Sequence, residues 1–209
     1  NQVQCFLEDS SGTVWMGMVS TGLDRYDPAR NIFSHYRHDP ANPASLSDNR
    51  VYALCEGRRG EVWIGTYGGG LNRLDPATGS FTRYTHNDSI RGSLAAPGIF
   101  ALLMDREGVL WVGTFGGGLD RFDEETETFT HFRHKASEPG SLSDDLVACL
   151  HEDRTGTLWV GTAGGLNRLD RTTGTFRQYR QKQGLPNDVI FGILEDDRRA
   201  RRHETSRAS

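Results

Sequence analysis

Four tryptophans recur along the chain at a constant spacing. Trp15, Trp63, Trp111 and Trp159 lie 48 residues apart, and each stands in a phrase of the form Val/Leu-Trp-x-Gly. A fixed period of roughly 20–50 residues indicates a repeat architecture in which every copy is one small structural unit. A residue that recurs in all copies is therefore expected to build the copy, and residues that break the period become the candidates for function.

Each copy has the composition of four short β-strands. In the copy at residues 45–92, the apolar or β-branched runs are 51–56, 62–66, 71–75 and 81–85, and Gly, Pro or Asp turns separate them. The 25 glycines of the chain also favour many tight turns over long helices. Four antiparallel strands per copy, apolar first and more polar last, are typical of a propeller blade. The sequence therefore predicts an all-β fold of the β-propeller class.

The period divides the chain into four blades and the beginning of a fifth. The predicted limits are 1–38, 45–86, 93–134, 141–181 and 186–197, with the first strand of the fifth copy at 189–195. The pattern then fails, because Arg199 and Arg202 stand where Gly and Trp are expected. We expect the polar segment 198–209 to be a disordered, out-of-register tail. A closed four-bladed ring and an open arc cut from a larger ring both remain possible at this point.

Most residue types that could carry chemistry belong to the repeat. One aspartate column precedes a glycine by three residues in each of three copies, as in Asx-type turns, and a second column ends the third strand. His38, His86 and His134 also form a column, so they are spread over different blades and predict no metal site. Three cysteines give no disulfide framework, and a net charge of −4 gives no footprint for nucleic acid. We therefore expect no catalytic residue, metal or cofactor.

The phrases themselves resemble a known family. The pattern Glu-Asp-x-x-Gly-x-Leu-Trp-Val-Gly-Thr, then Gly-Gly-Leu-Asn-Arg-Leu-Asp and Thr-Gly-x-Phe-x-x-Tyr, resembles the two-component regulator propeller repeat. It is nearly complete in residues 152–179 and 56–84, and looser in the first copy, where Met18-Val-Ser-Thr replaces the Gly-Thr-x-Gly segment. The resemblance extends over residues 1–197.

The resemblance implies a sensor. Proteins of this family are extracytoplasmic or periplasmic, with seven-bladed propellers followed by an immunoglobulin-like domain, a membrane helix and a histidine kinase. Several of them sense oligosaccharides. The resemblance thus implies a soluble, non-enzymatic ligand-binding module, part of a seven-bladed ring, from a membrane-anchored and possibly dimeric parent that signals by two-component phosphotransfer.

Residues that break the period on one face of the propeller are the candidates for binding a ligand. Loops on a rigid scaffold usually carry function, and aromatic planes beside hydrogen-bonding groups suit a sugar. The alternatives are that these are ordinary loop residues, that the chain is part of a propeller glycoside hydrolase or lyase, or that it is a protein-interaction scaffold. The candidate ligand-binding residues are Tyr67, Phe115, Asp48, Asn49, Arg50, Asp144 and Asp145.

Overall fold

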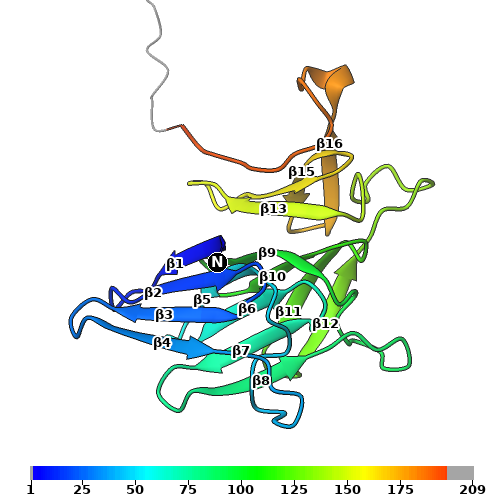
Figure 1. Ribbon diagram of the computed structural model, residues 1–209. Helices are drawn as coiled ribbons and strands as arrows, with labels where there is room; N and C mark the ends of the chain where they lie inside the picture. The colour runs from blue at the N-terminus through cyan, green and yellow to red at the C-terminus, as the bar shows by residue number, and fades with distance from the viewer. Residues whose placement is uncertain (1, 197–209) are drawn as a thin grey trace, which may run out of the picture.

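A computed structural model describes residues 2–196 and shows four antiparallel sheets of four strands each (Figure 1). The first contains β1 (Val3–Glu8), β2 (Val14–Met18), β3 (Leu23–Asp27) and β4 (Ile32–Tyr36). The second contains β5 (Val51–Glu56), β6 (Val62–Thr66), β7 (Leu71–Asp75) and β8 (Ser80–Tyr84). The third contains β9 (Ile99–Met104), β10 (Leu110–Thr114), β11 (Leu119–Asp123) and β12 (Thr128–Phe132). The fourth contains β13 (Val147–Glu152), β14 (Leu158–Thr162), β15 (Gly165–Asp170) and β16 (Thr175–Tyr179), and the 3-10 helix η1 (Gln181–Gln183) follows it.

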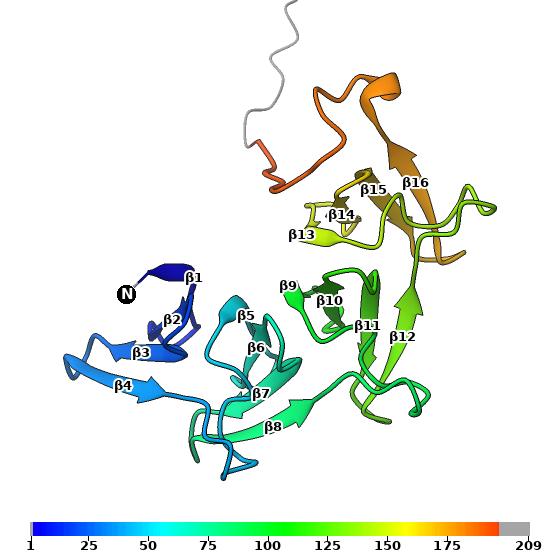
Figure 2. The same cartoon turned by 45° about the vertical axis from the view of Figure 1, so that its right-hand side comes forward.

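The four sheets are arranged as the blades of a propeller. Within each blade the strands pair in chain order, and the first strands of adjacent blades contact one another. Figure 2 shows β1, β5, β9 and β13 on the inner side of the arc and β4, β8, β12 and β16 on its outer side. The predicted all-β propeller is confirmed, and the four blades form an open arc rather than a closed four-bladed ring.

Blades are held together by a glycine-and-tryptophan interface, as the repeat predicted. Trp63 is 1% exposed, and its ring centroid lies 5.2 Å from that of Phe122 in the next blade. Two residues further along the strand, a Cβ on Gly65 would lie 2.5 Å from the Ile99 Cγ2 atom, also in the next blade. The tryptophan therefore fills the wedge between blades, while the glycine allows close approach of the neighbouring strand.

The aspartates before the second strand form the predicted Asx-type turns and also hold the tryptophans. Asp105 accepts hydrogen bonds from the Glu107 and Val109 amides and, at 2.8 Å, from the Trp111 indole Nε1. Burial alone would raise the pKa of Asp105, but these bonds hold it below its usual value. Asp9 and Asp153 make the same contacts to Trp15 and Trp159.

Blade two lacks this aspartate, and a carboxylate at another position takes its place. Gly57 stands in the aspartate column, and the Glu61 carboxylate accepts hydrogen bonds from the Arg59 amide at 2.9 Å and the Trp63 indole at 3.3 Å. The recurrent requirement is therefore a carboxylate beneath the indole, rather than one residue at one position.

The histidine and cysteine columns serve the scaffold. The Nδ1 atoms of His38, His86 and His134 lie 2.7–2.8 Å from the carbonyl oxygens of the linkers between blades. Burial raises the pKa of the Cys55 thiol to about 12 and that of Cys149 to about 11, and the cysteines form no disulfide in the described residues.

The beginning of the fifth copy lies against blade four but forms no strand. Ile190 occupies the slot facing Gly161, as Ile99 does facing Gly65, and its amide donates to the Thr162 carbonyl at 3.0 Å. Residues 189–195 make no β-ladder, because the described chain contains no second strand beside them. The predicted tail at 198–209 lies outside the described residues.

Candidate functional site

Every blade has a β-bulge at the start of its first strand. In blade two, Val51 pairs with Thr66 and Ala53 with Gly65, so Tyr52 is an extra residue without a partner. Phe100 is the extra residue of blade three. A bulge bends the strand and redirects the side chain of the extra residue. The first and fourth blades have Gln4 and Ala148 at this position, so of the four complete blades only blades two and three place an aromatic ring there.

These bulge residues join two aromatic side chains that follow the second strands. The Tyr52 ring centroid lies 5.6 Å from that of Tyr67 and 5.2 Å from that of Phe100, and the Phe100 centroid lies 5.3 Å from that of Phe115. Such tilted and edge-on contacts are favourable arrangements for aromatic pairs. We call Tyr52, Tyr67, Phe100 and Phe115 the aromatic cluster; it joins the predicted residues Tyr67 and Phe115 across two blades.

The outer members of the aromatic cluster are exposed. Tyr67 is 41% exposed and Phe115 is 50% exposed, whereas Tyr52 and Phe100 are half-buried beneath them. Exposed aromatic side chains supported by further rings form a rigid apolar surface. The loop carrying Phe115 is fixed as well, because its amide donates to the Gly98 carbonyl at 2.8 Å.

An ion pair borders this surface in blade two. Arg50 donates from Nε and Nη2 to the two carboxylate oxygens of Asp48, at 3.1 and 2.6 Å. The Arg50 guanidinium carbon lies 4.8 Å from the Tyr67 ring centroid, a cation–π contact. Burial alone would raise the pKa of Asp48, but the bonds from Arg50 hold it below its usual value.

Blade three has no such ion pair. Ala96, Pro97 and Gly98 replace Asp48, Asn49 and Arg50 in the linker. A Cβ on Gly98 would lie 2.9 Å from the Tyr67 carbonyl oxygen and 3.2 Å from the Phe115 Cβ. The glycine therefore allows the two aromatic loops to approach, and no side chain at this position covers the Phe115 ring.

The remaining predicted residues bind the scaffold in this structure. The Asn49 side chain accepts a hydrogen bond from the His38 amide at 2.8 Å, and that of Asp145 accepts one from the His134 amide at 2.6 Å. The Asp144 side chain accepts from the Leu146 amide at 2.8 Å. The structure thus groups Asp48, Arg50, Tyr67 and Phe115 and places the other three elsewhere on the scaffold, and a ligand-binding role for all seven stays a prediction.

Tyr52 and Phe100 were not among the candidate residues predicted from the sequence. Their column contains Gln4, Tyr52, Phe100 and Ala148, so it breaks the period as clearly as the column of Tyr67 and Phe115. The first apolar run of each copy predicts a strand buried on both sides, and the bulge that turns these two side chains toward the cluster is not visible in the sequence.

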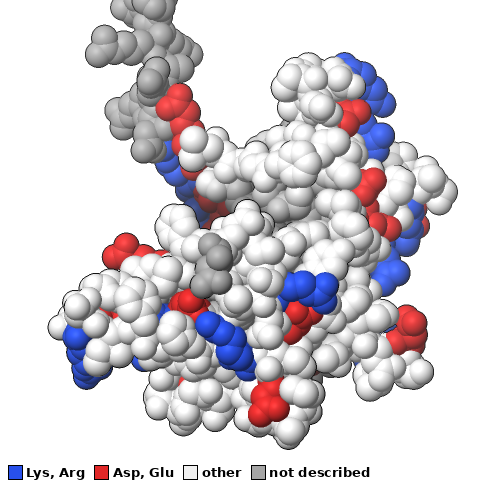
Figure 3. All heavy atoms as spheres, viewed as in Figure 1, with Lys and Arg blue, Asp and Glu red and all other residues white. Residues whose placement is uncertain are grey.

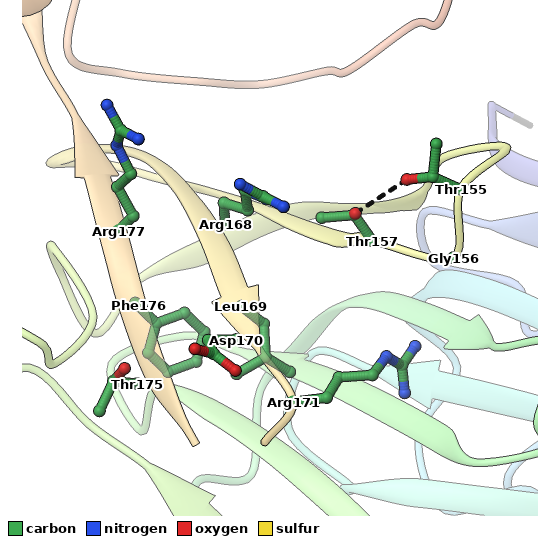
Figure 4. A pocket seen from close by; sticks show the side chains of 10 residues that line it. All are labelled: Thr155, Gly156, Thr157, Arg168, Leu169, Asp170, Arg171, Thr175, Phe176 and Arg177. Carbon is green, nitrogen blue, oxygen red and sulfur yellow. Dashed lines mark hydrogen bonds between the residues drawn. The ribbon is translucent and has the colours of Figure 1, made fainter. Parts of the chain in front are cut away.

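A separate hollow lies away from the aromatic cluster. It has a volume of about 550 Å³ and lies on blade four between the 155–157 turn and strands β15 and β16, where Arg168, Asp170 and Arg177 line it (Figure 4). A hollow of about 490 Å³ occupies the equivalent place on blade two, lined by Arg73, Asp75 and their neighbours. Because the hollow recurs, we interpret it as a feature of the blade surface rather than as a specific site.

The described residues contain no cluster of metal-ligating side chains. No group of three or more His, Cys, Asp or Glu side chains in residues 2–196 could hold a metal ion. The face shown in Figure 3 has basic and acidic side chains interspersed on a largely uncharged surface, without the single-sign patch that nucleic-acid binding requires.

Comparison with known proteins identifies the repeat. Residues 45–68, 93–116 and 141–164 match the family described as "Two component regulator propeller". The chain carries two-component regulator propeller repeats. No curated protein matches the chain significantly.

Solved structures similar to this chain include the extracellular domains of two bacterial signalling systems. The extracellular domain described for a hybrid two component system of B. thetaiotaomicron is 28% identical, with a TM-score of 0.72 over 85% of this chain and 23% of that one. A one component system's extracellular domain from the same organism shares the fold at 24% identity and a TM-score of 0.66, over 86% of this chain and 22% of that one. Virginiamycin B lyase from Staphylococcus aureus shares the fold at 20% identity and a TM-score of 0.63, over 85% and 55%.

This chain therefore spans about a quarter of the length of the sensor domains that it resembles. Within residues 2–196, the structure contains no helix with the length and hydropathy needed to cross a bilayer.

Proposed function

We propose that this chain is a ligand-binding part of an extracytoplasmic two-component sensor and that it recognises an oligosaccharide at the aromatic cluster. The observation that carries this proposal is the pair of exposed rings, Tyr67 and Phe115, which are supported by Tyr52 and Phe100 and lie on two adjacent blades. In the whole protein, this module lies outside the membrane and passes its binding state to a kinase.

Two features support a sugar as the ligand. Sugar rings have an apolar face that packs on an aromatic ring, while their hydroxyl groups need hydrogen-bonding partners nearby. The exposed ring of Phe115 offers the first, and the Asp48–Arg50 pair offers the second at the edge of Tyr67. The 28% identity to an extracellular two-component domain agrees with sensing rather than turnover.

The test is a glycan-array screen of the full chain followed by calorimetry. Phe115→Ala is expected to weaken binding by about tenfold or more, since stacking on an aromatic ring contributes roughly 1–3 kcal/mol. Phe33→Ala is the matched control, because Phe33 is also exposed, at 56%, but lies on the outer strand β4. Equal losses from both variants would contradict the proposed site.

Other outcomes point to other functions. Turnover of a bound sugar that is lost in Asp144→Ala would indicate a hydrolase or lyase. Failure of every sugar together with capture of a protein partner would indicate an interaction scaffold. Saturable binding without product is the result that we expect.

A further inference from the structure

We infer that the aromatic cluster selects uncharged oligosaccharides and disfavours acidic ones, an inference that rests on the proposed function. It concerns the charges around the rings rather than the rings themselves. The loops that meet at the cluster are residues 45–50 and 66–70 of blade two and 93–98 and 114–118 of blade three. Among all of these residues, only Asp48 and Arg50 are charged.

The single cation is already neutralised. Arg50 makes two hydrogen bonds to the Asp48 carboxylate, and its guanidinium lies over the Tyr67 ring. A bidentate pair of this kind satisfies the charge of both partners. A carboxylate or sulfate on a ligand would have to displace Asp48, and the displaced carboxylate would then lose its partner. Arg50 therefore extends the flat surface of Tyr67 instead of serving as an anchor for an anion.

The more open half of the cluster has no charge of its own. The linker beside Phe115 contains Ala95, Ala96, Pro97 and Gly98, and the Phe115 ring is half exposed. An uncharged, largely apolar surface binds by burial of apolar area and gives an acidic group no compensating partner.

The linker of blade four, which contacts the loop that carries Phe115, bears two negative charges. The two charges are those of Asp144 and Asp145. Both carboxylates accept hydrogen bonds from backbone amides, and neither of these bonds comes from a cation. The Asp145 carbonyl accepts hydrogen bonds from the Gly116 and Gly118 amides, which fixes this linker against the loop that carries Phe115. A ligand that extends from Phe115 toward blade four would bring an acidic group close to like charge, which is repulsive.

The experiment compares neutral oligosaccharides with uronic-acid and sulfated oligosaccharides of the same length, by calorimetry on the full chain at low and high salt. We expect neutral sugars to bind at least about tenfold more tightly, which corresponds to one or two repulsive contacts near the surface. We also expect their affinity to be insensitive to salt, because no ion pair with the ligand forms.

Two variants test the ion pair between Asp48 and Arg50. Asp48→Asn keeps the acceptor for the Arg50 amide, as the chain's own Asn187 does for the Val189 amide at 3.0 Å, but frees the guanidinium. It should raise the affinity for acidic sugars several-fold in a salt-dependent manner. Asp88→Asn, at a 96% exposed side chain in the same inter-blade region, is the matched control and should change nothing.

The outcomes separate this inference from the proposed function. Acidic sugars that bind as well as neutral ones, or an Asp48→Asn variant that gains no affinity for acidic sugars, would overturn the inference while the sensing function stands. If no oligosaccharide of either class binds, the proposed function fails and this inference fails with it.

Discussion

Two phenylalanines at the same repeat position should respond very differently to truncation. Phe33 and Phe81 both lie in the fourth strand of their blades and both pair across to the third strand. Phe81 is 7% exposed and packs against Tyr36 of the preceding blade, with ring centroids 5.7 Å apart. Phe33 is 56% exposed and stacks only on Tyr26 of its own blade, at 4.6 Å.

The burial predicts the size of the difference. Phe81→Ala removes a buried ring and leaves a cavity between two blades, which costs about 3–5 kcal/mol of unfolding free energy. Phe33→Ala removes a ring that keeps less than half of its surface from water and leaves no closed cavity. Its cost should be about 1 kcal/mol. The difference between the two variants is therefore expected to be on the order of 3 kcal/mol.

The measurement is urea unfolding followed in parallel by tryptophan fluorescence and circular dichroism, because blades in a repeat protein can unfold separately. Coincident transitions with an unchanged denaturant slope allow the two free energies to be compared. A Phe33→Ala variant as damaging as Phe81→Ala would refute the reasoning, since it would mean that the face of blade one is covered in solution. Light scattering at two protein concentrations would then show whether a second copy covers it.

Three further predictions concern the scaffold. Burial raises the pKa of Asp120 above its unfolded value of about 3.9, so its stabilising contribution is present below that pH and is lost as the pH rises through the folded pKa. Asp120→Asn should therefore raise the unfolding midpoint near about pH 8, and the gain should shrink toward about pH 4. Gly65→Ala should cost about 1–3 kcal/mol in the same urea assay, because its Cβ meets Ile99. The Cys55 thiol, with a pKa raised to about 12 by burial, should react with a thiol reagent only after unfolding.

For each of these three predictions, one result would contradict the reasoning. Asp120→Asn introduces the residue that blades two and four have at this position, Asn72 and Asn167. A loss of stability near neutral pH would therefore show that the pair with His131 stabilises the fold by more than burial of the Asp120 carboxylate destabilises it. Gly192→Ala has open space around its Cβ and should be neutral; equal costs at Gly65 and Gly192 would argue against a steric interface. Rapid labelling of folded Cys55 would show that this interface opens.

The fold could be predicted from the sequence because its determinants repeat. A single Trp-x-Gly phrase says little, but four copies at one spacing fix the strand count, the pairing order and the position of the interface between blades. The contacts of Trp63 and Gly65 then follow from the need to pack one blade against the next. The ends of the arc could not be predicted in the same way, because the exposure of Phe33 depends on which neighbour a blade has, and the repeat is the same in either case.

The candidate site was only partly predictable, for a different physical reason. Tyr67 and Phe115 were found because they differ from the other copies, and nothing in the sequence indicated that Tyr52 and Phe100 support them. That support depends on a bulge, which shifts a residue from its regular position without a change in composition. The pairing of Arg50 with Asp48 is also a matter of geometry, since the same two residues could equally have faced a ligand separately.

The copies therefore differ in two ways: some substitutions are compensated by another residue of the same blade, and others are not. Substitution at Gly57 is compensated by Glu61, so that the carboxylate beneath Trp63 is kept; this variation preserves the scaffold. The changes from Asp48 to Ala96 and from Arg50 to Gly98 are not compensated elsewhere in blade three, and they leave the Phe115 ring uncovered. Loss of a stabilising ion pair beside an exposed ring contributes nothing to folding. Its most direct physical consequence is an open, uncharged surface, which is what a ligand with an apolar face requires.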